Sequence, residues 1–126
     1  MAKPKPSRTF EDAIAPYSDG VRTLAKQTRA ALRKLLPDCI ETVDNSGPYI
    51  SFGYTTGYKG MVATIIISKA GVKLGLAGGA SLPDPEELLE GSGKVHRYVV
   101  ISSADVLRQR AVIALVRSAD ERARTS

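Results

Sequence analysis

The feature that most constrains this chain is a pair of strand-like segments separated by only three residues. Residues 60–68 are rich in β-branched side chains, and residues 72–76 alternate apolar side chains with Lys73 and Gly75. The intervening Lys69, Ala70 and Gly71 fit a three-residue hairpin loop with its glycine in a left-handed conformation. Strands joined this closely run antiparallel, so the sequence predicts an antiparallel sheet.

Further strands are expected on either side of this hairpin. Residues 49–54 carry β-branched and aromatic side chains, and residues 97–101 include three consecutive branched apolar residues. A sheet of about four to five strands follows from this pattern.

The first long helix is expected at residues 19–36. Ser18 is a suitable N-cap, Asp19 complements the positive end of the helix, and Pro37 forbids a further turn. Side chains that recur at spacings of three and four form one predicted buried stripe, made of Val21, Leu24, Thr28, Leu32 and Leu35.

Three more helices are predicted around it. A capping-box pattern, Thr9 with Asp12, starts a short helix that ends at Pro16. Residues 83–91 fit a helix of one or two turns that begins at Asp84. A second long helix is expected at residues 103–123, with inward-facing Val106, Ile113, Val116 and Ala119. The predicted fold class is α+β, with an antiparallel sheet and two long helices packed on one face.

Size and composition predict one domain in a reducing compartment. The 126 residues suit a single core, which we place at residues 10–123, between a disordered basic tail at 1–9 and a short tail at 124–126. The single cysteine, Cys39, cannot form an internal disulfide, and we expect it to be structural. With neither a signal-like segment nor a membrane-spanning apolar run, a cytoplasmic location is expected and a membrane partner is not.

A basic stripe on the first long helix is the broadest functional hint. The chain carries 18 basic and 13 acidic residues, a net charge of +5, and four of the cations share one helix face: Arg22, Lys26, Arg29 and Arg33. Such a stripe could bind a small anion or nucleic acid, or it could be an ordinary solvated face. Because aromatic residues are only 6% of the chain, nucleic acid is not the expected partner.

Acidic residues gather before the only histidine. Together with His96 they could bind iron or another hard cation; alternatively, the acids cap a helix and the histidine lies on a strand surface. The metal candidates are Asp84, Glu86, Glu87, Glu90 and His96.

No set of residues in the sequence forms a complete catalytic constellation. Residues 91–94 resemble a phosphate-binding loop but lack its first glycine and the hydroxyl residue after Lys94. We therefore expect a small non-catalytic binding or interaction domain without a resident cofactor. An exposed sheet edge could pair two copies into a homodimer.

Two stretches resemble the YdhG-like family of domains of unknown function. The first combines residues 36–41 with 47–49. The second combines residues 72–80, 82–85 and 88–94 with Arg97, and the similarity extends over about residues 14–119. The resemblance implies an α+β fold in a bacterial protein, and in one branch a frataxin-like fold linked to iron handling.

The same resemblance suggests a shared polar pocket. Its candidates are Glu41, Tyr49, Lys94 and Arg97, in which a carboxylate facing two cations could hold a small anionic ligand. Alternatively, Glu41 simply pairs with Lys94 or Arg97 to fix the sheet against a loop.

Overall fold

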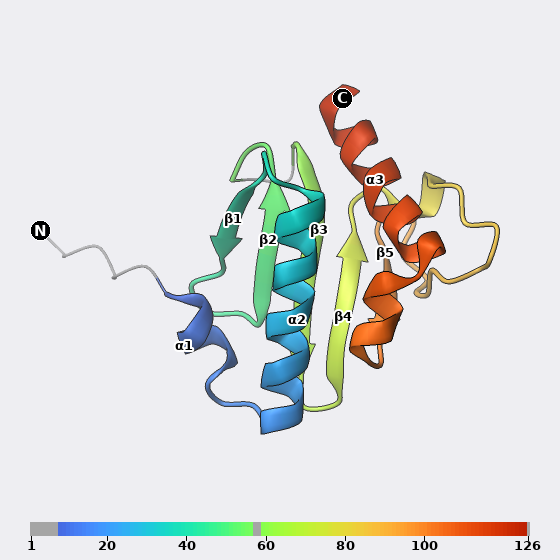
Figure 1. The fold of residues 1–126 in the computed structure, drawn as a ribbon. Helices are drawn as coiled ribbons and strands as arrows, with labels where there is room; N and C mark the ends of the chain where they lie inside the picture. Colours follow the sequence, from blue (N-terminus) through green and yellow to red (C-terminus); the bar gives the residue numbers. More distant parts are fainter. Residues whose placement is uncertain (1–7, 57–58, 126) are drawn as a thin grey trace, which may run out of the picture.

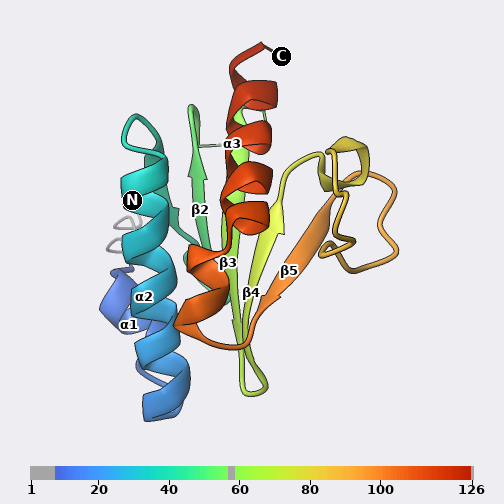
Figure 2. The same cartoon turned by 45° about the vertical axis from the view of Figure 1, so that its right-hand side comes forward.

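The computed structural model describes residues 8–56 and 59–125. Its elements follow the chain in the order α1 (Phe10–Ile14), α2 (Asp19–Leu35), β1 (Ile40–Val43), β2 (Tyr49–Gly53), β3 (Met61–Ser68), β4 (Gly71–Leu76), the 3-10 turn η1 (Gly79–Ser81), β5 (Arg97–Ile101), the 3-10 turn η2 (Ala104–Arg108) and α3 (Arg110–Thr125). The five strands form one antiparallel sheet in the order of the chain, β1-β2-β3-β4-β5 (Figure 1). Helices α2 and α3 both cover the same face of this sheet (Figure 2). The predicted α+β fold class is confirmed.

The ends of the first two helices are set by the residues that the sequence singled out. Thr9 and Asp12 form both hydrogen bonds of the capping box at α1. The Ser18 hydroxyl accepts from the Val21 N–H at the start of α2, and α2 stops at Leu35, two residues before Pro37. Each cap satisfies an amide that the helix itself leaves without a partner.

The core lies between α2, α3 and one face of the sheet. The strand register places Ile50, Ile65 and Leu74 in one row and Phe52 in the next, and all four side chains are at most 1% exposed. From α2, Leu32 reaches the same depth. Because neighbours along a strand point to opposite faces, the other face of the sheet carries a separate set of side chains.

Two local predictions about the sheet need correction. The β3–β4 hairpin has a two-residue loop, because Gly71 pairs with Ser68 and belongs to β4. Strand β1 was not located from the sequence. It pairs with β2, and in the loop that connects the two strands the Asp44 carboxylate accepts from the Ser46 and Gly47 amides.

The predicted helix at residues 83–91 is wrong. The Asp84 carboxylate accepts from the amides of Leu88 and Leu89, both at 2.9 Å, and draws the chain into a tight loop. Glu87 has a left-handed backbone with φ 54°, which a right-handed helix excludes. The segment instead crosses to β5, where Glu90 pairs with Tyr98.

The predicted helix at residues 103–123 is divided in two. Gln109 has an extended backbone, with ψ 133°, that separates η2 from α3. Of its predicted inward residues, Val116 and Ala119 are buried, whereas Val106 and Ile113 are half-buried.

The predicted tails also change at their inner ends. Helix α3 runs to Thr125, so residues 124 and 125 are helical. The Arg8 guanidinium donates to the Gly47 carbonyl at 2.8 Å, which fixes residue 8 to the β1–β2 loop. The rest of the predicted basic tail, residues 1–7, and residue 126 lie outside the described part of the chain.

Candidate functional site

The four residues predicted to form a polar pocket do not come together. Glu41 and Arg97 belong to one row of the register but lie on β1 and β5, the two edges of the sheet. Four strand spacings of about 4.8 Å separate them by roughly 19 Å. Tyr49 lies in a different row, on the face that the helices leave open, and Lys94 is exposed in the loop before β5. The predicted pairing of Glu41 with Lys94 or Arg97 is therefore wrong.

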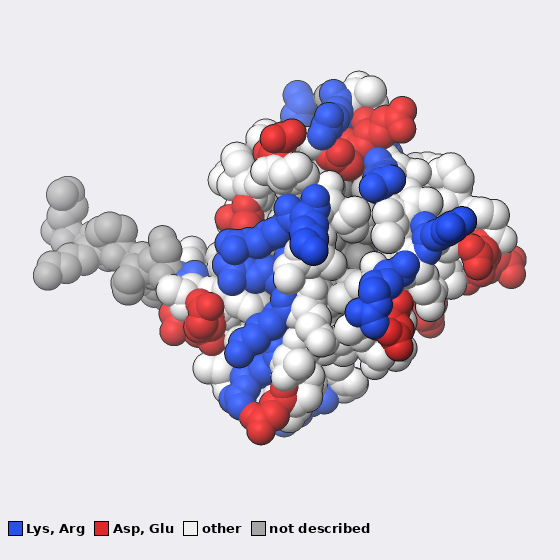
Figure 3. Space-filling model, viewed as in Figure 1, with Lys and Arg blue, Asp and Glu red and all other residues white. Residues whose placement is uncertain are grey.

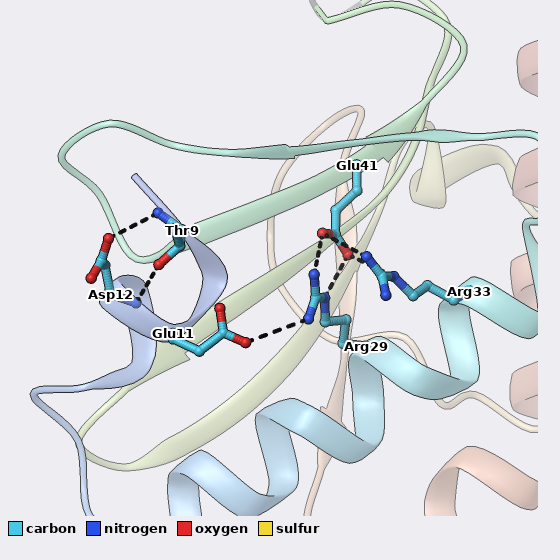
Figure 4. Close-up of polar contacts among 6 residues, drawn as sticks. All are labelled: Thr9, Glu11, Asp12, Arg29, Arg33 and Glu41. Carbon is cyan, nitrogen blue, oxygen red and sulfur yellow. Dashed lines mark hydrogen bonds and ion pairs between the residues drawn. The ribbon is translucent and has the colours of Figure 1, made fainter. Parts of the chain in front are cut away.

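Glu41 instead joins the edge of the sheet to α2. Its carboxylate accepts from Arg29 Nε at 2.8 Å and Arg29 Nη2 at 2.7 Å, and Arg33 Nε lies 3.3 Å away (Figure 4). Arg29 also stacks over the Phe10 ring, with its guanidinium carbon 4.3 Å from the ring centre. Burial raises the pKa of Glu41, but the hydrogen bonds and charge of Arg29, with help from Arg33, lower it by more.

This arrangement gives part of the predicted anion-binding stripe a structural role. Figure 3 shows the stripe as a basic band along α2. Arg29 and Arg33 are engaged by Glu41, and Arg22 pairs with Asp19 one turn earlier. Lys26 is exposed. Arg29 and Arg33 therefore hold β1, an edge strand of only four residues, against α2.

The candidates for a metal site are dispersed. Asp84 accepts backbone amides, and Glu86, Glu87 and Glu90 are exposed. His96 Nδ1 accepts from the Gly78 amide at 3.2 Å. Within residues 8–56 and 59–125, no three His, Cys, Asp or Glu side chains are grouped so that they could hold a metal ion.

One hollow lies on the open face of the sheet. It has a volume of about 560 Å³, and its lining includes Tyr49, Ser51, Met61, Thr64, Ile66, Gly75 and His96. Two of these residues, Tyr49 and His96, were singled out in the sequence, although for different sites. The others reach the hollow because β2, β3 and β4 bring them side by side.

Small side chains produce this hollow. The register aligns Thr42, Ser51, Thr64 and Gly75 in one row across the four strands β1 to β4. Gly75 contributes no side chain, and a Cβ built there would meet Ile66 Cδ1 at 3.2 Å, so Ile66 leans over it. The Ser51 and Thr64 hydroxyls lie 3.3 Å apart. The floor is therefore short and polar between larger apolar walls.

The proton-accepting groups that line the hollow are already engaged. Because His96 Nδ1 accepts a hydrogen bond from Gly78, the proton of the neutral ring lies on Nε2. The Asp44 carboxylate accepts from Gly47 and Ser46, and these backbone hydrogen bonds lower its pKa. Asp44 is consequently a poor base toward anything held in the hollow, and the Nδ1 lone pair of His96 is taken up by the Gly78 amide.

Sequence reasoning missed this site because its main signal is an absence of bulk. Gly75 lies inside a strand, where a glycine often marks a close approach or a bend. The alternation of Ser51 with Ile50 and Phe52 also places a small polar residue on the outer face. Both signals are present in the sequence, but only the strand register shows that they meet.

A second polar cluster ties α3 to β2. The Tyr54 hydroxyl donates to the Asp120 carboxylate and accepts from Arg124 Nε at 2.7 Å. Burial and the bond to Asp120 raise the pKa of Tyr54 to about 12. Nearby, burial and the charge of Asp120 raise the pKa of Cys39, which disfavours the reactive thiolate. This cluster stabilises the packing of α3.

Comparisons with known proteins identify no relative. No family model, curated protein or solved structure matches this chain. The resemblance to the YdhG-like family thus stays a prediction. Among the helices of the described residues, none combines the length and the apolar character needed to cross a bilayer.

Proposed function

We propose that this chain is a non-catalytic binding domain that holds a small, uncharged ligand in the hollow on the open face of its sheet. Support comes from the lining: the hydroxyls of Ser51 and Thr64 lie in the floor, and Met61, Ile66 and the Tyr49 ring form apolar walls. Ligand sites commonly combine an apolar enclosure with a few polar groups that fix orientation.

One observation carries the non-catalytic part of the proposal. His96 Nδ1 already accepts the Gly78 amide, so the imidazole offers a ligand a donor, Nε2–H, and no free base. A general base must accept a proton within hydrogen-bond reach of its substrate. A ligand carbonyl or hydroxyl oxygen could accept from Nε2–H, while the floor hydroxyls bond its other polar groups.

The proposal is tested by titrating the protein with uncharged cyclic amides and phenyl glycosides while recording amide NMR spectra. We expect shifts concentrated at Ser51, Thr64, Gly75 and His96. Gly75→Val fills the floor and should abolish them, whereas Val100→Phe adds bulk to the same face outside the lining and should not.

Two results would contradict the proposal. If the shifts appear elsewhere, or persist in Gly75→Val, the hollow is not the binding site. If the protein converts a bound compound to product, and this conversion is lost in His96→Ala, the domain is an enzyme.

A further inference from the structure

A second groove lies on the opposite side of the molecule, between α2 and the η2–α3 segment. It has a volume of about 510 Å³, and its apolar lining comes from both sides: Ala30, Ala31 and Leu35 from α2, and Leu107 and Ile113 from η2 and α3. Ala30 is exposed, and Ala31, Leu35 and Ile113 are half-buried. This apolar surface stays accessible because only part of each helix packs into the core.

The groove has a cationic rim. Lys34 and Arg108 line it from opposite sides, and none of its lining residues is acidic. Figure 3 shows the same pattern, with basic side chains along α2, others beside α3 and uncharged surface between them. Arg108 pairs with Asp105, whose side chain is 79% exposed, and such a pair contributes little. Lys34 has no salt bridge within the described residues.

We propose that this groove binds an acidic amphipathic helix of a partner protein. Apolar side chains on one face of such a helix would contact the floor, and flanking Asp or Glu residues would meet Lys34 and Arg108. The alanines of α2 leave room for a close approach, since packed helices lie about 8–10 Å apart. Nucleic acid fits less well, because its phosphates would use the rim and leave the apolar floor uncovered.

The dimensions fit a short helix. The lining residues of α2 span Gln27 to Leu35, eight steps of about 1.5 Å, or about 12 Å of helix axis. Two to three turns of the partner would cover this length. The contact is small, which is typical of a transient interaction whose encounter is steered by charge.

The test uses a synthetic peptide of about 15 residues, long enough to form some helix in solution. It carries leucines at spacings of three and four and glutamates beside them; a matched peptide carries lysines in place of the glutamates. Binding to the full chain is measured by fluorescence anisotropy at low and high salt. We expect the acidic peptide to bind, more weakly at high salt, and the lysine peptide not to bind.

Variants of the protein separate the rim from the floor. The pair Lys34→Glu with Arg108→Glu should weaken binding about tenfold or more. The pair Lys69→Glu with Lys94→Glu makes the same charge change away from the groove and should have little effect. Ala30→Phe fills the floor without changing charge and should also abolish binding, with circular dichroism confirming that the variant is folded.

Four outcomes would overturn the proposal. The first is no binding of the acidic peptide up to about 1 mM, the weak end of specific association, and the second is equal binding of the lysine peptide. The third is tighter binding of a short DNA duplex whose affinity is unchanged by Ala30→Phe. The fourth is self-association of the protein that disappears in the Lys34 and Arg108 double variant. The last result would show that a second copy occupies the groove.

Discussion

The two faces of the sheet are built from the same strands but have opposite character. On the face covered by α2 and α3, side chains such as Phe52, Ile65 and Leu74 are at most 1% exposed. On the open face, Tyr49 is 45% and Val100 is 40% exposed, and a row of short polar residues leaves a hollow.

Alternate residues of each strand therefore have different roles, one set in the core and the other on the open face. Burial of apolar area on the covered face supplies most of the folding free energy. The open face contributes little to stability, so its side chains can be shaped for contact with a ligand.

The largest difference is expected for truncation of a core side chain. Phe52→Ala should lower the free energy of unfolding by about 3–5 kcal/mol, because it removes a buried ring and leaves a cavity. Ile66→Ala, on the open face and only partly buried, should cost less, about 1–2 kcal/mol. Urea unfolding of both variants measures the difference, and equal losses would refute the division between the faces.

The next largest effect concerns the edge of the covered face. Glu41→Gln should cost about 1–3 kcal/mol, because it leaves the partly buried Arg29 guanidinium without its charged partner. Glu11→Gln is the control: its carboxylate is 73% exposed and lies 4.0 Å from Arg29, so we expect about 0.5 kcal/mol or less. A similar loss of unfolding free energy in both variants would show that the Arg29–Glu41 pair is not the main stabilising contact of Arg29.

The pH dependence of stability should follow the same carboxylate. The pKa of Glu41 in the folded protein lies below its ordinary value of 4.5, so the folded state binds its proton less readily than the unfolded state does. Its contribution is complete above pH 4.5 and is lost as the pH falls through the folded pKa. Urea unfolding should therefore show a smaller loss of stability on acidification in Glu41→Gln than in the unaltered protein; an identical loss would contradict this assignment.

The smallest effect is expected in the floor of the hollow. Thr64→Val removes a hydroxyl whose partner, the Ser51 hydroxyl, can turn to solvent, and it keeps a β-branched side chain in the strand. The free energy of unfolding should change by about 0.5 kcal/mol or less. A loss above about 2 kcal/mol would show that the open face is part of the stabilising core.

Much of the fold could be predicted because it is encoded locally. Ser18 and Pro37 set the ends of α2, and the pattern of residues 60–76 predicts a hairpin, although its loop is one residue shorter than expected. Prediction failed where a local signal competes with an equally local alternative. Asp84 has the chemistry of a helix cap, yet its carboxylate closes a loop with the amides of Leu88 and Leu89.

The site was harder to predict because it depends on register and packing. Glu41 could have met any of several cations, and its pairing with Arg29 depends on how α2 packs on the sheet and on the position of β1, a strand that the sequence did not reveal. The hollow depends on Ser51, Thr64 and Gly75 lying opposite one another, which only the strand pairing establishes.

The sequential strand order has a consequence for how the protein is made. Each strand pairs with the one synthesised just before it, so the sheet can grow by one strand at a time as the chain leaves the ribosome. Helix α2 precedes the sheet, whereas α3, which covers β3 and β4 beside it, follows β5. A nascent chain therefore exposes part of the apolar surface of its sheet until α3 docks. A chaperone that binds apolar surface would be most useful during that interval.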